Sequence, residues 1–292
     1  MVAASATSPL AVLGSGSLTA YWRFQRAVAA AQLQAWLPPG GRILLDISGP
    51  QSSGASQAAA SGYVVIRVLQ APPPARLVGE GRRGEAAFSP SRRSARSGDR
   101  GAPGGRPPGT TQSRPPGQIL SLVADPSRLS FLGDSVVDGV IAEDGALSAH
   151  LMAEDVAAEI SRVLRPGGQL LACVDSLVLG MSILAEQHHW AELTDLPQAE
   201  VVLIPWPDGR ITRCFGPEQL SDLLTEAGLE VSWIRPRTVL SPSMVDHVLR
   251  KEPGAIMRLV RAEMTAGQEE APAAGGSGSF GMYLLAAARK PG

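Results

Sequence analysis

Residues 40–50 read GGRILLDISGP, an apolar run that closes on an acidic residue and then on small, turn-forming residues. The apolar residues 43–45 lead directly into Asp46, and Ser48 and Gly49 follow it. An open α/β sheet presents its first strand to a nucleotide-like ligand in this way, as a buried strand running into a tight turn. We therefore expect a binding site at the turn after Asp46.

The segments on either side of this stretch alternate between strand and helix patterns. Further strands are predicted at 63–69, 119–125, 136–142, 169–174, 229–234 and 280–288, and helices at 18–37, 56–61, 153–164, 217–227 and 243–265. The run RPGG at 165–168 is expected to end the helix that precedes it. Strands that alternate with helices predict an α/β fold with a doubly wound, mostly parallel, seven-stranded sheet and helices on both faces.

Composition narrows the class of protein. The 292 residues carry a net charge of −1 and are 44% hydrophobic and 18% charged, as expected of a globular chain rather than a uniformly basic nucleic-acid binder. Cys173 and Cys214 lie far apart, so they suggest no disulfide framework and no metal site. The most apolar stretch, 170–185, contains Asp175 and is too short to span a membrane, and the first residues do not have the pattern expected of a signal peptide. We expect a cytoplasmic protein that does not enter a membrane.

Two segments depart from the globular pattern. Residues 1–17 are expected to form a flexible N-terminal tail ahead of a domain at 18–292. Residues 71–117 are rich in Pro, Gly and Arg and are expected to be a disordered insertion within that domain. Between residues 72 and 118 there are nine arginines against three acids. This segment is either a solvated loop or a basic recruitment site for an anionic partner such as RNA.

The first predicted helix, 18–37, carries an aromatic stripe that includes Tyr21 and Trp22. One interpretation is a helix that packs against the core. The other is that Tyr21 and Trp22 form a lid over a ligand pocket.

The stretch EISRVLRPGG at 159–168 is the most specific motif in the chain. Together with the strand-end acid Asp125, the strand VDGV at 137–140 and the segments 215–231 and 283–290, it resembles the class I S-adenosylmethionine-dependent methyltransferase family. The resemblance covers most of the chain outside the tail and the insertion. It implies a Rossmann-like sheet, S-adenosylmethionine as the cofactor, and methyl transfer to an acceptor.

Family logic also implies which residues meet the cofactor. The cofactor-binding candidates follow successive strands and are Asp46, Ser48, Gly49, Arg67, Asp125, Pro126 and Glu143. Asp125 occupies the position of the acid that meets the adenine amino group. The first loop departs from the family, because Asp-x-Gly-x-Gly becomes DISGP and proline removes an N–H donor. The second strand ends RVLQ instead of in the acid that holds the ribose hydroxyls. In the alternative interpretation, Asp46 and Asp125 only cap backbone N–H groups.

Methyl transfer needs few catalytic groups, because positioning and desolvation lower most of the barrier and a base is needed only for a protonated acceptor. The candidates near the strand ends and beyond are Glu143, Asp144, His150, His188 and His189. Histidine titrates near neutral pH and is the natural base, although adjacent histidines such as His188 and His189 also occur simply as solvated polar residues. The proline-rich segment 204–210, with Arg213, is expected to cap the acceptor pocket.

The leading hypothesis is a methyltransferase that acts on a small molecule, because the ordered segments carry no basic stripe interleaved with aromatic residues. Two alternatives stay open. One is a catalytically silent methyltransferase-like protein that binds or regulates a partner, which the altered first loop favours. The other is an RNA methyltransferase guided by the basic insertion. The sequence leaves the oligomeric state open.

Overall fold

The computed structural model describes residues 15–38, 42–49, 52–70, 117–196, 199, 201–206, 209–269 and 281–292. The chain divides into one compact unit of residues 1–71 and 116–292 and a second of residues 72–115, and every described residue belongs to the first. The insertion predicted at 71–117 therefore lies outside the described residues except for Gly117, as do residues 1–14 of the predicted tail. Residues 15–17 already belong to the first helix.

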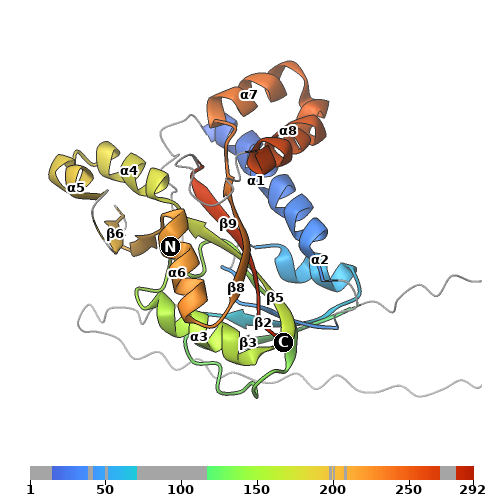
Figure 1. Ribbon diagram of the computed structural model, residues 1–292. Helices are drawn as coiled ribbons and strands as arrows, with labels where there is room; N and C mark the ends of the chain where they lie inside the picture. The colour runs from blue at the N-terminus through green and yellow to red at the C-terminus, as the bar shows by residue number, and fades with distance from the viewer. Residues whose placement is uncertain are drawn as a thin grey trace, which may run out of the picture. The chain divides into compact units, whose positions relative to one another are not determined.

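A sheet forms the centre of this unit (Figure 1). It has seven strands in the order β3-β2-β1-β4-β5-β9-β8. The strands are β1 (Ile43–Asp46), β2 (Val64–Leu69), β3 (Gln118–Val123), β4 (Val137–Ala142), β5 (Leu164–Asp175), β8 (Glu230–Arg237) and β9 (Tyr283–Arg289). The pairs among the first five strands of this order are parallel, and β9 is antiparallel to both β5 and β8. The prediction of a doubly wound, mostly parallel sheet is confirmed.

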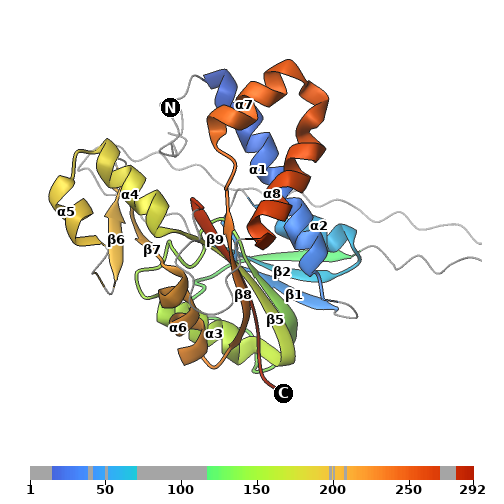
Figure 2. The same ribbon diagram turned by 45° about the horizontal axis from the view of Figure 1, so that its top comes forward.

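Helices cover both faces of the sheet because successive strand residues point to opposite sides. Leu44 packs with α1 (Ser15–Trp36) and α2 (Gly54–Ala60), whereas Leu45 packs with α3 (Ala153–Val163) and α6 (Pro217–Glu226). Figure 2 shows the two helical layers on either side of the strands. The apolar runs of the central strands are therefore buried on both faces, as a parallel sheet requires.

The RPGG run lies inside β5 rather than ending α3 ahead of it, which corrects the expected boundary. The α-helix stops at Val163, and Leu164 already has extended backbone dihedrals. Gly167 takes a positive φ of 76°, which a residue with a Cβ adopts only with strain, and this turns the chain within the extended segment.

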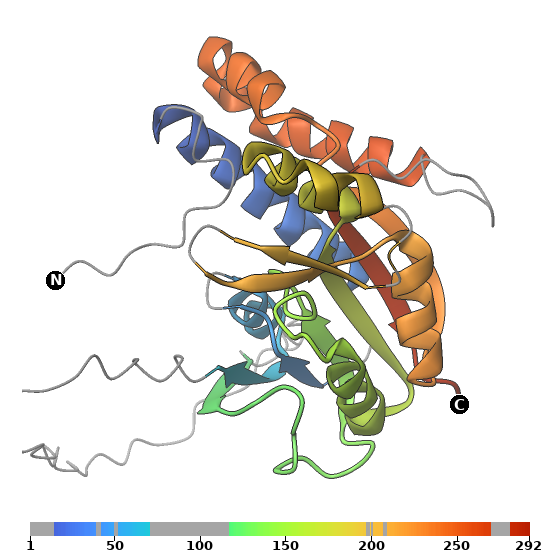
Figure 3. The ribbon, with the colours of Figure 1, turned by 90° about the vertical axis from the view of Figure 1, so that its left-hand side faces the viewer.

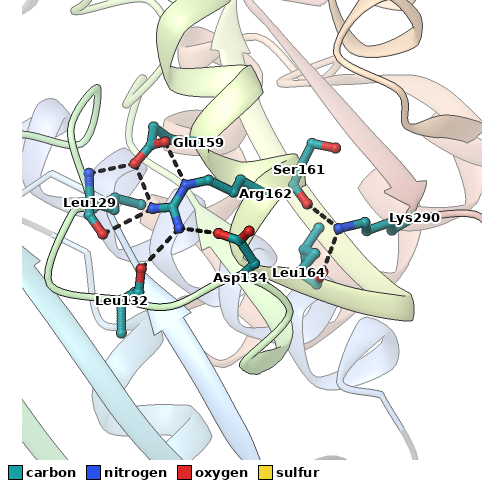
Figure 4. A network of polar contacts seen from close by, with 8 residues as sticks. All are labelled: Leu129, Leu132, Asp134, Glu159, Ser161, Arg162, Leu164 and Lys290. Atoms are coloured by element: carbon teal, nitrogen blue, oxygen red, sulfur yellow. Dashed lines mark hydrogen bonds and ion pairs between the residues drawn. The ribbon is translucent and has the colours of Figure 1, made fainter.

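Arg162, the first arginine of the 159–168 motif, holds the loop before β4 in place (Figure 4). Arg162 donates to both carboxylate oxygens of Glu159, to Asp134, and to the carbonyls of Leu129 and Leu132, at 2.8–3.0 Å. Lys290 donates to the carbonyl oxygens of Ser161 and Leu164 at 2.8 and 2.9 Å, which satisfies acceptors at the C-terminus of α3. The most specific motif of the sequence thus has a structural role.

Helices α7 (Pro242–Lys251) and α8 (Ile256–Glu269) pack against α1, and α8 also contacts β8 (Figure 2). The sequence predicted one helical stretch at 243–265. A 3₁₀ turn at Pro253–Ala255 separates two helices instead, because proline lacks the N–H that would continue the hydrogen-bond ladder. Tyr21 is buried between α1 and this pair, with Phe24 and Val245, so it packs in a core rather than forming a lid.

A small outer layer follows β5. It contains α4 (Leu177–Glu186), α5 (Trp190–Asp195) and an antiparallel hairpin of β6 (Val202–Pro205) and β7 (Ile211–Cys214), which Figure 3 shows beside the main sheet. Leu179, Ile183 and Ile204 form its core. Among the helices that the structure describes, none combines the length and the apolarity needed to cross a membrane.

Candidate functional site

The carboxyl ends of β1 and β4 meet at one edge of the sheet, where the strand order reverses direction. Strands on one side of this point continue toward β3, and strands on the other side continue toward β8. In open α/β sheets, ligands bind in the crevice outside the strand ends at such a reversal. The predicted turn after Asp46 and the pair Glu143 and Asp144 both lie there.

Asp46 is fully buried, and its Oδ1 accepts a hydrogen bond of 2.9 Å from the amide of Ser48. Burial raises the pKa of this carboxyl, while the bonds from Ser48, the charge of Arg67 and the amide of Ala55 act in the opposite direction. Oδ2 is buried as well, and no group of the described residues meets it with ordinary hydrogen-bond geometry. The alternative interpretation, that Asp46 caps backbone N–H groups, accounts for Oδ1 but leaves Oδ2 available.

Ser48 and Gly49 tie this turn to the end of β4. Ser48 Oγ accepts a hydrogen bond of 2.9 Å from the amide of Glu143, and the Gly49 amide lies 3.4 Å from the carbonyl oxygen of Glu143. A Cβ added to Gly49 would stand 2.5 Å from Asp144 Oδ2, so the Asp144 side chain lies directly over the glycine. A larger residue at position 49 would therefore require the Asp144 side chain to move. Pro50 lies outside the described residues.

Glu143 is buried and paired with a residue far away in the sequence. Arg237, at the end of β8, donates to its two carboxylate oxygens at 2.6 and 2.9 Å. Arg237 Nε also donates to Gln32 Oε1 at 2.6 Å. A role for Glu143 in acid–base chemistry or in cofactor binding stays a prediction, and it would require this bidentate pair to open.

The ends of β2, β3 and β4 bring three further polar groups together. Asp125 is exposed, and Ser127 donates to its Oδ1 from both the amide and the hydroxyl, which lowers the pKa of the carboxyl. His150 Nε2 lies 3.1 Å from Gln70 Nε2. Burial lowers the pKa of His150, and the charge of Asp125 acts in the opposite direction. Pro126 is buried beside this group. Sequence reasoning identified Asp125 and His150 but overlooked Gln70.

Arg67 lies in β2 directly opposite Asp46 in the strand register. Its Nη2 is 3.5 Å from the carbonyl oxygen of Ser52, and its charge opposes the burial effect on Asp46. Arg67 therefore lies beside the turn that follows β1, and its role in cofactor binding stays a prediction.

His188 and His189 are not brought to the strand ends. They lie in the turn between α4 and α5, at the end of α4 that points away from the sheet (Figure 1). The His188 ring contacts the Trp190 ring at 5.8 Å between centroids, and His189 Nδ1 lies 3.4 Å from the Glu192 carboxylate. These are local contacts within one turn.

Asp175, the last residue of β5, is a group that sequence reasoning overlooked. Only 8% of it is exposed, and burial raises its pKa to about 7, assisted by the charge of Asp144 and opposed by Arg210 and by a hydrogen bond from Thr212. The signal was present, because the apolar run 170–174 closes on an acid as the runs before Asp46 and Asp125 do. Asp175 and Asp144 thus form a pair of carboxyl groups at the mouth of β4 and β5.

The hairpin β6–β7 supplies the groups that face this pair. Trp206 Nε1 donates to Thr212 Oγ1 at 2.7 Å, and the guanidinium of Arg210 lies 5.1 Å from the Trp206 ring centre. Arg213 is held by Glu154 at 2.7 Å. Thr212 and Arg210 both oppose the rise in the pKa of Asp175, so the hairpin lies next to the strand-end acids. That segment 204–210 covers an acceptor pocket stays a prediction, and residues 207 and 208 lie outside the described residues.

Comparison with known proteins was made on sequence and on structure. No protein-family model and no curated protein matches the chain. A Listeria monocytogenes protein, provisionally assigned as an S-adenosylmethionine-dependent methyltransferase, superposes with a TM-score of 0.50 at 12% identity, covering 91% of this chain and 99% of its own.

Two further structures align over similar lengths with lower scores. A Burkholderia thailandensis 1,6-didemethyltoxoflavin-N1-methyltransferase with bound S-adenosylhomocysteine gives a TM-score of 0.49 at 18% identity, covering 100% of this chain and 94% of its own. A methyltransferase from Methanosarcina mazei gives 0.49 at 17% identity, covering 89% and 97%. With the strand order and the switch point described above, the Listeria likeness leads to one conclusion: this chain has the fold of the S-adenosylmethionine-dependent methyltransferases.

Proposed function

We propose that this protein is an S-adenosylmethionine-dependent methyltransferase that acts on a small-molecule acceptor. The observation that carries the proposal is the convergence of polar groups on the switch point. The turn at 46–49, the acids Asp144 and Asp175, and the Gln70, Asp125 and His150 group all occupy the carboxyl edge of the sheet. Because fold alone does not determine chemistry, the proposal depends on these residues rather than on the likeness in architecture.

The residues at this edge fit the chemistry of the cofactor. Asp125 is an exposed carboxylate with Oδ1 occupied by Ser127, and no hydrogen bond from the described residues uses Oδ2, which suits the adenine amino group. Gln70, exposed at the end of β2, offers an amide where the family has an acid for the ribose hydroxyls. Asp144 and the buried, unpartnered Oδ2 of Asp46 favour the positively charged groups of the cofactor.

When bound, S-adenosylmethionine supplies a methyl group activated by the sulfonium. The contribution of the chain would be to hold the acceptor in line and to take its proton. Asp175 is the best-placed base, because a carboxyl with a pKa of about 7 is partly ionised at neutral pH and still basic enough to accept a proton. Thr212 orients this carboxyl, and its burial keeps bulk water away.

The side chains around Asp175 support the choice of a small-molecule acceptor. The β6–β7 hairpin brings Thr212 and Arg210 close to the acid and leaves Trp206 beside them. The RNA alternative depends on residues 71–117, which lie outside the described residues apart from Gly117. Both cysteines are buried and free, in keeping with a cytoplasmic location.

The proposal is tested by incubating the protein with S-adenosylmethionine carrying a labelled methyl group and a library of small amines, phenols and carboxylic acids. The expected result is labelled product from at least one acceptor class and loss of turnover in Asp175→Asn with cofactor binding retained. If the cofactor binds but no acceptor class is labelled, the silent binding protein becomes the better interpretation. The observation that favours the silent binding protein is the Glu143–Arg237 pair, because the arginine takes up a strand-end carboxylate that an enzyme could use for its ligands.

A further inference from the structure

A cavity whose lining does not include the strand-end acids lies between α1, α8 and the face of the sheet formed by β5, β9 and β8. Its volume is about 350 Å³, within the lower range of small-molecule sites. Its walls include Gln32, Trp36, Gln169, Trp233, Arg235 and Met264. All of these residues belong to the compact unit that contains the sheet.

The strand register separates this cavity from the strand-end site. In the β5–β9 pair, Gln169 lies opposite Arg289 at one end and Asp175 lies opposite Tyr283 at the other. Gln169 and Arg289 line the cavity, whereas Asp175 belongs to the strand-end acids. Leu285 and Pro236 also line the cavity, so it extends along the sheet face from Gln169 toward the strand-end site but does not include the strand-end acids.

The walls of the cavity are aromatic and cationic. The Arg235 guanidinium carbon lies 4.5 Å from the centre of the Trp233 ring, which holds the charge against one indole face. Trp36, which is 9% exposed, supplies a second indole. None of the described residues that line the cavity is an aspartate or a glutamate. Arg289, which also lines the cavity, forms an ion pair with Glu230 at 2.6 Å. Arg235 is therefore the lining arginine whose charge we expect a ligand to meet.

Two buried donors in these walls have no partner among the described residues. They are Arg235 Nε and the indole Nε1 of Trp36. Because these two nitrogens have almost no accessible surface, a ligand in the cavity would meet the accessible part of the Arg235 guanidinium rather than Nε. The Arg235 charge, the absence of acids among the described lining residues and the flat indole side chains are together complementary to a planar ring that carries an acidic group.

We propose that this cavity is a binding site for a small aromatic carboxylate. The ring lies between the indole walls of Trp36 and Trp233, where aromatic packing favours planar groups. The carboxylate accepts hydrogen bonds from Arg235, whose planar guanidinium matches carboxylate geometry. The site is distinct from the proposed cofactor and acceptor site and does not depend on methyl transfer.

The test uses naphthalene carboxylate as the probe and the uncharged naphthalene carboxamide as its matched control. Binding is followed by quenching of tryptophan fluorescence and by calorimetry, on the wild-type chain and on Arg235→Gln. The control variant is Arg258→Gln, which removes an exposed arginine that pairs with Glu252 outside the cavity.

The carboxylate is expected to bind one site per chain at least about tenfold more tightly than the amide, and Arg235→Gln is expected to abolish that preference while Arg258→Gln retains it. Equal binding of the two probes to the wild-type chain, or no binding of either, would overturn the proposal without any variant. So would an unchanged preference in folded Arg235→Gln. The result is independent of the proposed methyl transfer. If the two sites are separate, saturating the strand-end site with S-adenosylhomocysteine is expected to leave the binding of the naphthalene probe unchanged.

Discussion

Replacing Asp175 by Asn removes a buried carboxyl whose charge the fold disfavours. The amide has nearly the same shape, and its carbonyl oxygen can still accept the hydrogen bond from Thr212. It cannot ionise, so it imitates the protonated form of Asp175 at every pH. The substitution therefore isolates the cost of the negative charge at the mouth of β5.

The size of the effect follows from the pKa. Burial, with repulsion from Asp144 second, raises the pKa of Asp175 from 3.8 to about 7. The folded state therefore binds this proton more tightly than the unfolded state, and the free energy of unfolding falls as pH rises from about 4 to about 7. A difference of roughly three units at ~1.36 kcal/mol each gives about 4 kcal/mol as an upper limit. Water entry around the ionised group reduces the measured value.

The assay is urea unfolding followed by tryptophan fluorescence, at pH values from about 4 to about 8. Asp175→Asn is expected to match the wild-type chain near pH 4 and to be more stable above pH ~7, by about 2 to 4 kcal/mol. The control, Asp222→Asn, changes an exposed acid of α6 and should follow the wild-type curve. If Asp175→Asn is no more stable than wild type at high pH, Asp175 ionises normally and its assignment as a near-neutral base is wrong.

Three further substitutions test the framework of the site. Arg162→Ala removes the hydrogen bonds that fasten the loop before β4 and is expected to cost about 2–4 kcal/mol of unfolding free energy, whereas Arg26→Ala, an exposed position on α1, should cost less than ~0.5 kcal/mol. Equal losses would show that the Arg162 network is inert. Glu143→Gln leaves the buried Arg237 without its full counter-charge and should cost about 3 kcal/mol, part of which the double variant with Arg237→Gln recovers. Additive losses in that cycle would rule out coupling. Asp125→Ala should weaken S-adenosylhomocysteine about tenfold in calorimetry, with only a small loss of unfolding free energy from the missing Ser127 bonds; unaltered affinity would exclude Asp125 as the adenine ligand.

The fold could be predicted from local patterns because each strand and helix carries its own signal. The sequence correctly predicted the strand that ends at Asp46, and it correctly predicted a helix that begins at Pro217 and stops before Gly228. Residues that begin or end a helix act within a few positions, so a local pattern is enough to identify them. The boundary at RPGG was wrong because Gly167 turns the chain inside an extended segment, which the sequence alone does not distinguish from a helix stop.

The site was harder to predict because its geometry depends on residues that meet only after folding. The Glu143–Arg237 pair joins β4 to β8, and no local pattern links the two positions. The high pKa of Asp175 arises from burial and from Asp144, which are properties of the packed structure. His188 and His189 looked suitable by residue type, but α4 carries them away from the strand ends (Figure 1).

The most direct test of the proposed function is calorimetric titration of the wild-type chain with S-adenosylhomocysteine. We predict saturable binding to one site per chain, weakened by Asp125→Ala and by Gly49→Ala, whose added Cβ would collide with the Asp144 carboxylate. No heat of binding from natively folded protein would contradict the assignment of the strand-end edge as a cofactor site.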